Sequence, residues 1–178
     1  ASAFTGGTAP TQVVQETVFG SALVIGNTLM EHDGTVNFAV KPTGSMQTVT
    51  SSRMPVDATV VRAFLLWSGS EGMFGTDRDI DLRLPDGTFF NDLSVDFPTA
   101  GDPASPLNSC DRVNSAGNTP VPYYSCRREV THLLQQLGPG GALGTYEVSD
   151  VDLQAGDCNN DPFCQAMYGG WALVIMWE

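Results

Sequence analysis

The stretch that decides the fold is GGWALVIMWE, residues 169–178, which contains seven consecutive apolar residues. An unbroken apolar run of this length predicts a strand in the interior of a sheet that is covered on both faces. The two preceding glycines allow a tight turn into the strand. The run is far too short to cross a membrane, which takes about 20 apolar residues. We therefore expect Leu173 and Ile175 to lie in the core.

The segments before this run continue the β pattern. DATVVRAFLLW, residues 57–67, is apolar on both faces apart from Arg62, which predicts a second central strand. RDIDLRL, residues 78–84, alternates apolar and charged residues, as in a strand with one buried face. Pro85-Asp86-Gly87 then predicts a hairpin turn into the next strand, TFFNDLSV, residues 88–95.

One helix interrupts the strands, and we expect it near residues 126–137. Ser125 can cap it, apolar residues recur from Val130 to Leu137 with helical spacing, and Gly138-Pro139-Gly140 ends it. The pattern predicts an all-β, mainly antiparallel fold, a two-sheet β-sandwich or jelly roll with this one short helix. We divide the chain into a flexible N-terminal arm, 1–10, and a single domain, 11–178.

The composition is that of an acidic globular protein. Hydrophobic residues make up 42% of the 178 and charged residues 16%, and the formal net charge is −12. Such a surface repels phosphate backbones and anionic lipids, so we expect neither nucleic acid nor an anionic membrane as a partner.

Four cysteines indicate disulfides and therefore export. Cys110, Cys126, Cys158 and Cys164 form an even set whose spacing is not that of a zinc site. Four cysteines allow three pairings, of which Cys110–Cys126 and Cys158–Cys164 are the local ones. Free buried thiols in a cytosolic protein are the alternative. Each local bridge would hold a polar loop, the first within residues 98–122 and the second within 154–168.

Three stretches resemble a known group of domains. VVRAFLLWSGS (60–70), the block REVTHLLQQLGPGGALGTYEVSDVDL (128–153) and GGWALVIMWE (169–178) occur in that order. Together they resemble the exported bacterial surface β-sandwich domains of uncharacterised envelope proteins, which carry a "DVT…GxYxVxDV…GWALVVVYE" pattern. The resemblance implies the fold and a bacterial surface or secreted location, and it implies no activity. Glu129 stands where the family has aspartate, and related domains commonly continue with further strands beyond this point.

The sequence shows no catalytic signature, and we expect a protein that is not an enzyme. Ser70 lies outside a nucleophile elbow, and His132 and His32 are better explained as a helix residue and a turn residue. Asp79 and Asp81 share a strand face, which a solvated face explains without a pair of glycosidase carboxylates.

Calcium is the one cofactor for which the sequence suggests ligands. Asp157, Asn159 and Asp161 alternate in a polar loop, a spacing that can place oxygen ligands around a hard cation. Asp150 and Asp152 are near enough in sequence to contribute. The alternative is a polar loop that a disulfide holds without metal, and we expect no cofactor.

Two functions follow as expectations. The first is a non-enzymatic structural protein of a bacterial cell surface or extracellular filament, which self-associates through strand exchange. The second is an adhesin module that binds glycans or another surface through loops 98–124 and 154–168. Loop aromatics at Tyr123, Tyr124 and Phe163 would then contact the ligand. The alternative is that these rings cover the core beneath the disulfide loops.

Overall fold

The protein folds into two antiparallel sheets and one short helix. The computed structural model describes residues 17, 19–32, 38–41, 43–71, 76–96, 107–113, 122–153 and 168–178. The larger sheet has the strand order β1 (Ser21–Thr28), β11 (Gly169–Trp177), β5 (Val60–Ser70), β9 (Tyr123–Glu129) and β8 (Ser109–Val113).

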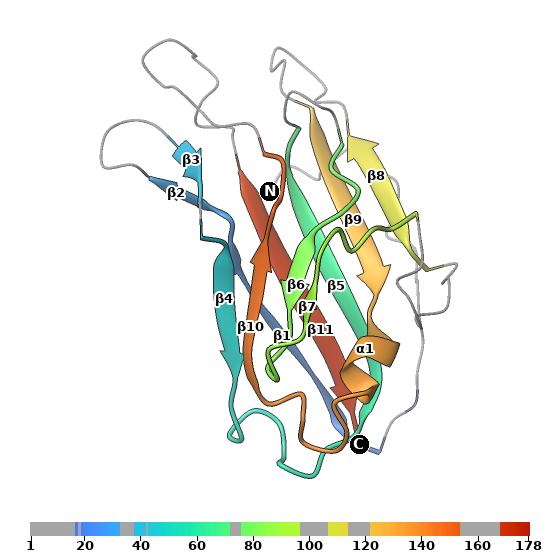
Figure 1. Ribbon diagram of the computed structural model, residues 1–178. Helices are drawn as coiled ribbons and strands as arrows, with labels where there is room; N and C mark the ends of the chain where they lie inside the picture. The colour runs from blue at the N-terminus through green and yellow to red at the C-terminus, as the bar shows by residue number, and fades with distance from the viewer. Residues whose placement is uncertain are drawn as a thin grey trace, which may run out of the picture.

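The smaller sheet packs against one face of the larger one, as Figure 1 shows. Its strand order is β4 (Ser45–Val49), β10 (Gly144–Ser149), β6 (Asp81–Arg83) and β7 (Phe89–Phe90). A further pair is formed by β2 (Met30–His32) and β3 (Phe38–Val40). The predicted fold class, mainly antiparallel β in two sheets with one short helix, is confirmed, and the arrangement is β-sandwich-like.

The terminal apolar run forms β11, which lies between β1 and β5 as a central strand should. Only one of its faces is fully covered. Trp171, Leu173, Ile175 and Trp177 point into the core, whereas the residues between them are half-buried. The expectation of burial on both faces was therefore wrong. Seven apolar residues in a row do not distinguish a doubly covered strand from one that leaves its outer face partly open.

The core lies between the two sheets. Leu65 and Trp67 of β5 and Leu173 of β11 are at most 1% exposed, as are Tyr146 and Val148 of β10 on the opposite sheet. The Tyr146 hydroxyl donates to the carbonyl of Ala142 at 2.8 Å, which satisfies this phenol inside the core.

The helix is shorter than the sequence predicts. It spans Thr131–Gln135 as α1, and residues 126–129 belong to strand β9 instead. Val130 precedes the helix without any side-chain cap, so Ser125 has no capping role. The reason is tertiary: Cys126 pairs with Trp67 and Arg128 with Leu65 on β5, so the sheet extends to Glu129.

Two local predictions have different outcomes. The hairpin at 85–87 is confirmed, because β6 pairs with β7 and Gly87 adopts a left-handed φ of 90°. The loop expected over 98–122, by contrast, contains an edge strand, β8, which pairs with β9. Its polar sequence, SCDRV, has no apolar alternation that would have indicated a strand.

Candidate functional site

The predicted site residues are distributed unevenly over the structure. Cys110 and Cys126 form a disulfide between directly opposed positions of β8 and β9, which is one of the two local pairings. Several other predicted positions, and the predicted arm 1–10, lie outside the described residues: Cys158, Cys164, Asp157, Asn159, Asp161 and Phe163.

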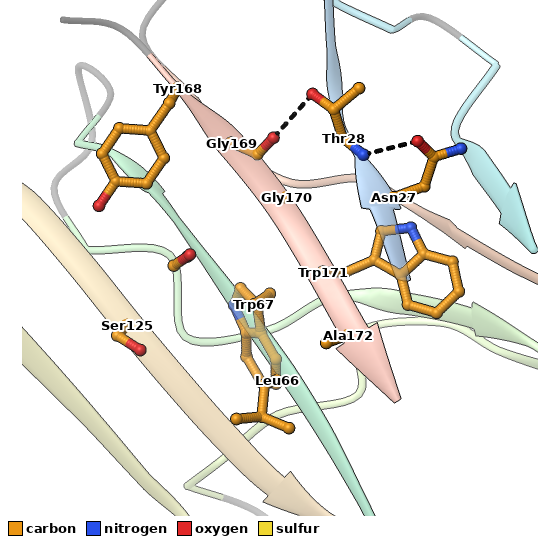
Figure 2. A pocket seen from close by; sticks show the side chains of 11 residues that line it. Asn27, Thr28, Leu66, Trp67, Ser125, Tyr168, Gly169, Gly170, Trp171 and Ala172 are labelled. Carbon is orange, nitrogen blue, oxygen red and sulfur yellow. Dashed lines mark hydrogen bonds between the residues drawn. The ribbon is translucent and has the colours of Figure 1, made fainter. Parts of the chain in front are cut away.

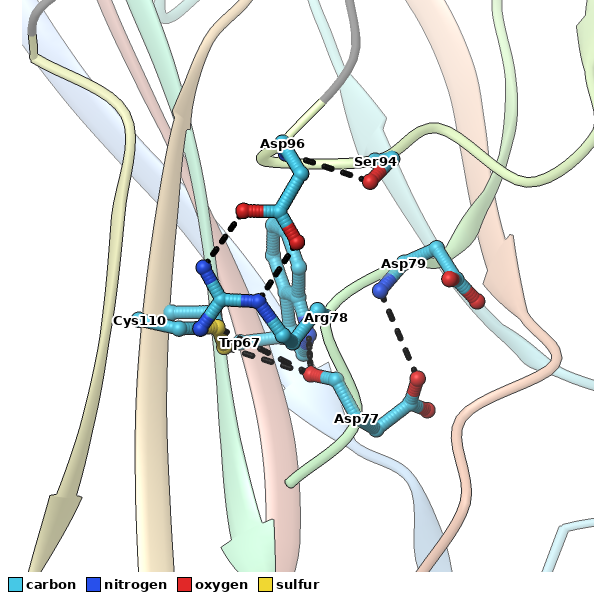
Figure 3. Close-up of polar contacts among 8 residues, drawn as sticks. Trp67, Asp77, Arg78, Asp79, Ser94, Asp96 and Cys110 are labelled. Carbon is cyan, nitrogen blue, oxygen red and sulfur yellow. Dashed lines mark hydrogen bonds and ion pairs between the residues drawn. A yellow bond between two sulfur atoms is a disulfide. The ribbon is translucent and has the colours of Figure 1, made fainter. Parts of the chain in front are cut away.

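The segment that follows residue 76 packs over the disulfide, as Figure 3 shows. The Trp67 indole N–H donates to the Asp77 carbonyl at 3.1 Å, and the two disulfide sulfurs lie 3.8 Å and 3.2 Å from the same oxygen. Arg78 donates two hydrogen bonds of 2.6 Å to Asp96. These contacts hold Asp77 and its carboxylate at the edge of the core.

The Asp77 side chain is a half-buried acid. Its two oxygens accept the backbone N–H groups of Asp152, at 2.5 Å, and Asp79, at 3.4 Å. Burial raises the pKa of Asp77 to about 6, although these two hydrogen bonds oppose the rise. A native state that binds this proton more tightly than the unfolded chain gains stability as the pH falls from about 6 to 4.

We predict a pH dependence that Asp77→Asn removes. Wild type should gain about 1 kcal/mol of unfolding free energy relative to the variant between pH 7 and pH 4.5, a value reduced for partial exposure. Urea unfolding at a series of pH values measures the difference. An equal pH slope in both proteins would contradict the assignment, whereas a constant offset would report only the hydrogen bond that the amide cannot accept.

Three aspartates from different elements form a cluster of carboxylates. Carboxylate oxygens of Asp81, Asp92 and Asp150 all lie within 4.8 Å of one another. The Asp92 backbone N–H donates to Asp81 at 3.0 Å, and Asp92 and Asp150 have φ angles of 53° and 55°. Oxygen ligands at this spacing are the kind that hold Ca²⁺, and they would need further oxygens to complete its shell.

The sequence interpretation of Asp81 differs from its position. Asp81 is only 8% exposed and lies in this cluster, where a solvated strand face was expected. Burial, followed by the charges of Asp150 and Asp92, raises the pKa of Asp81 against a lowering hydrogen bond from Asp92. Of the two sequence-suggested calcium ligands that the structure describes, Asp150 and Asp152, Asp150 lies in this cluster.

A separate feature is a groove on the outer face of the larger sheet, which Figure 2 shows. It has a volume of about 450 Å³ and crosses strands β1, β11, β5 and β9. Its floor is a cross-strand row in which Thr28 lies opposite Gly170, Gly170 opposite Ser68, and Ser68 opposite Ser125. Such a row of small side chains between larger ones leaves the sheet surface hollow.

An aromatic pair stands at one end of the groove. The rings of Tyr123 and Tyr168 stack with their centroids 4.9 Å apart, and Tyr168, which lines the groove, is 46% exposed. Tyr124, by contrast, is 1% exposed, and its hydroxyl donates to the carbonyl of Asp152 at 3.2 Å. Strand alternation therefore places Tyr123 outside and Tyr124 in the core, where it cannot contact a ligand.

Sequence reasoning missed the groove residues. Tyr168 had an available signal, since an aromatic beside two glycines at a strand start is often exposed in a turn. Ser68 and Ser125 had none, because nothing local in the sequence shows that they become neighbours.

A dyad of Ser70 and His132 is excluded by position. Ser70 ends β5 and its hydroxyl donates to the Tyr168 carbonyl at 3.2 Å. His132 is in α1, beside the other end of β5, where the neighbouring Gln135 donates to the Val60 carbonyl at 3.0 Å. Strand rise alone separates the two ends of β5 by roughly 30 Å.

In the part of the chain that the structure describes, no helix is long and apolar enough to cross a membrane.

The fold and these sites define a β-sandwich-like domain with a cross-strand disulfide, an acidic cluster and an uncharged surface groove. The chain matches no protein-family model, no curated protein and no solved structure.

Proposed function

We propose that the chain is a non-enzymatic structural domain of a bacterial cell surface or extracellular filament, whose copies associate through one exposed sheet face. The resemblance to envelope domains supports the bacterial surface. The disulfide supports an oxidising compartment outside the cytosol. The proposal of self-association depends mainly on one observation, the apolar outer face of β1 and β11.

We call this surface the aliphatic patch and define it as Ala22, Val24, Val174 and Met176. Ala22 lies opposite Met176 and Val24 opposite Val174, so the four side chains form two adjacent rows on the outer face. Val24 is 56% exposed, and Val174 and Met176 are half-buried. An antiparallel sheet that faces water normally carries polar side chains at these positions, and a contiguous apolar patch marks an interaction surface.

Charge favours a second copy as the occupant of the patch. The chain carries a net charge of −12, so two copies repel each other through most of their surfaces. The four patch residues carry no charge, and contact there brings few like charges together while it buries apolar area. The patch is therefore a surface where two copies can approach at low electrostatic cost.

The outer edge of β1 gives no support to strand exchange at that position. The Arg53 guanidinium donates to the Val24 carbonyl at 2.9 Å, and the Thr28 N–H donates to the Asn27 side chain at 2.8 Å. Side chains that occupy edge groups in this way hinder the addition of another strand. We therefore propose face-to-face contact through the aliphatic patch, and strand addition at other edges stays a prediction.

The association has a direct test in Val174→Asp. Wild type should show concentration-dependent association in analytical ultracentrifugation, and a charge in the centre of the patch should weaken it at least tenfold. Thr48→Asp is the matched control, because Thr48 is exposed on the outer face of the smaller sheet and the variant adds the same charge.

Two results would contradict the proposed self-association through the aliphatic patch. Wild type that stays monomeric up to millimolar concentration would do so, and so would an equal loss of association in both variants. The second result would show that net charge, and not the patch, controls the association.

A further inference from the structure

We infer that the groove across β1, β11, β5 and β9 is a binding site for a neutral carbohydrate chain. The groove lies at the Tyr168 end of β11, whereas the aliphatic patch occupies the other end of the strand. The inference does not depend on self-association, because the two surfaces share no residue. The inference rests on four features of the groove: its open floor at Gly170, the hydroxyls of Ser68 and Ser125, the exposed Tyr168 ring, and a described lining without charged residues.

Gly170 keeps the floor of the groove open, and packing constrains it less than the other glycines of the sheet. A Cβ atom at Gly170 would meet its nearest neighbour, the Asn27 carbonyl oxygen, at 3.3 Å, a tight contact that a small shift relieves. At Gly26 and Gly69 an added Cβ would come within 2.2 Å and 2.0 Å of other atoms, so packing explains those two glycines. Gly170 lies in an extended strand, where glycine costs stability, and its effect here is to leave space above the sheet.

Two serine hydroxyls on the floor of the groove have no hydrogen-bond partner among the described residues. Ser68 and Ser125 lie directly opposite each other on β5 and β9, and neither side chain hydrogen bonds with any residue that the structure describes. The polar groups at the β1 side differ, since Asn27 and Thr28 already bond to backbone groups such as the Met46 and Gly169 carbonyls. Each free hydroxyl can both donate and accept, as a partner rich in hydroxyl groups requires.

The aromatic end supplies a flat apolar surface beside these hydroxyls. The Tyr168 ring is held by its stack with Tyr123, so little side-chain entropy is lost when a ligand contacts it. A sugar ring presents an apolar C–H face and a rim of hydroxyls. An aromatic surface next to hydrogen-bonding groups matches both features, and a few polar groups in an apolar site fix ligand orientation.

The charges of the chain and of the groove favour a neutral ligand. Among the residues that the structure describes, none that lines the groove is charged. The net charge of −12 repels anionic polymers, and a cationic peptide would find no carboxylate in the groove to pair with. A volume of about 450 Å³ is within the usual range for ligand sites, and the groove is open to the surface, which suits a segment of a longer chain.

The test is isothermal titration calorimetry of the whole chain with neutral hexasaccharides: cellohexaose, maltohexaose, mannohexaose and chitohexaose. At least one should bind with a Kd below 1 mM, and Gly170→Val, which fills the floor, should weaken binding at least tenfold. Tyr168→Ala should weaken it similarly, because it removes the aromatic surface. Thr48→Val, on the other sheet, is the control and should bind as wild type does.

Three outcomes would overturn the inference: no binding of any of the four sugars, binding that survives both groove variants, or binding of a hexagalacturonate probe alone. Thermal unfolding of each variant shows whether it remains folded. If Gly170→Val does not fold, Ser68→Ala/Ser125→Ala replaces it, with the same expected loss. Sugar binding is measured by calorimetry and self-association by ultracentrifugation of Val174→Asp. A failure of the carbohydrate inference can therefore be distinguished from a failure of the proposed self-association.

Discussion

Leu173→Asp should yield no folded protein. Leu173 is fully buried at the centre of β11, and β11 pairs with β1 on one side and β5 on the other. An ionised carboxylate at this position would have no partner, and burying it costs several kcal/mol in addition to the lost leucine contacts. Domains of this size have a total stability of about 5–15 kcal/mol, so one such substitution removes most of it.

The measurement is soluble yield, circular dichroism and thermal unfolding, with Val174→Asp as the matched control. Val174 is the next residue on the same strand, and its side chain lies on the outer face. The same introduced carboxylate should therefore unfold the protein at position 173 and leave it folded at 174. Ile175→Asp should behave as Leu173→Asp does. A soluble, cooperatively unfolding Leu173→Asp protein would contradict the placement of β11.

Removal of the Cys110–Cys126 disulfide should produce the second largest loss. The bridge joins residues 16 positions apart, and a crosslink of that loop length stabilises a protein by about 3 kcal/mol. Cys126 is also 1% exposed and packs in the core, so its loss adds a small cavity. We expect Cys110→Ala/Cys126→Ala to lower the unfolding midpoint by about 6–12 °C.

Calorimetry or urea unfolding of the double variant checks this value. Reduction of wild type alone is not sufficient, because Cys158 and Cys164 are also present in the chain. The variant therefore isolates the bridge between β8 and β9. An unchanged midpoint would mean that the β8–β9 pairing holds the two positions together without the covalent bond.

The acidic cluster shows where sequence reasoning failed, and why. The alternation of residues 78–84 correctly predicted that Ile80, Leu82 and Leu84 are buried. It wrongly placed Asp81 in solvent, because alternation reports the two sides of one strand and not what covers the second side. Asp92, which follows β7, and Asp150, which follows β10, come close to Asp81 only in the folded chain.

The prediction of the helix bounds failed for a related reason. Its spacing of apolar residues is real, and Leu133 and Leu134 are buried as predicted. The first four expected helical residues are instead part of β9, since each can pair with β5 and add sheet hydrogen bonds. Local propensity is a weak preference, and the tertiary context overrides it.

By itself the sequence determined the strand-rich class, the central position of β11 and β5 in the sheet and the apolar core, because these depend on patterns within a few neighbouring residues. Only the tertiary structure decided which face of β11 stays open, which cysteine partners Cys110, and which residues line the groove. Thr28, Gly170, Ser68 and Ser125 come from four separate strands. They become one surface through strand order and register, which no local pattern specifies.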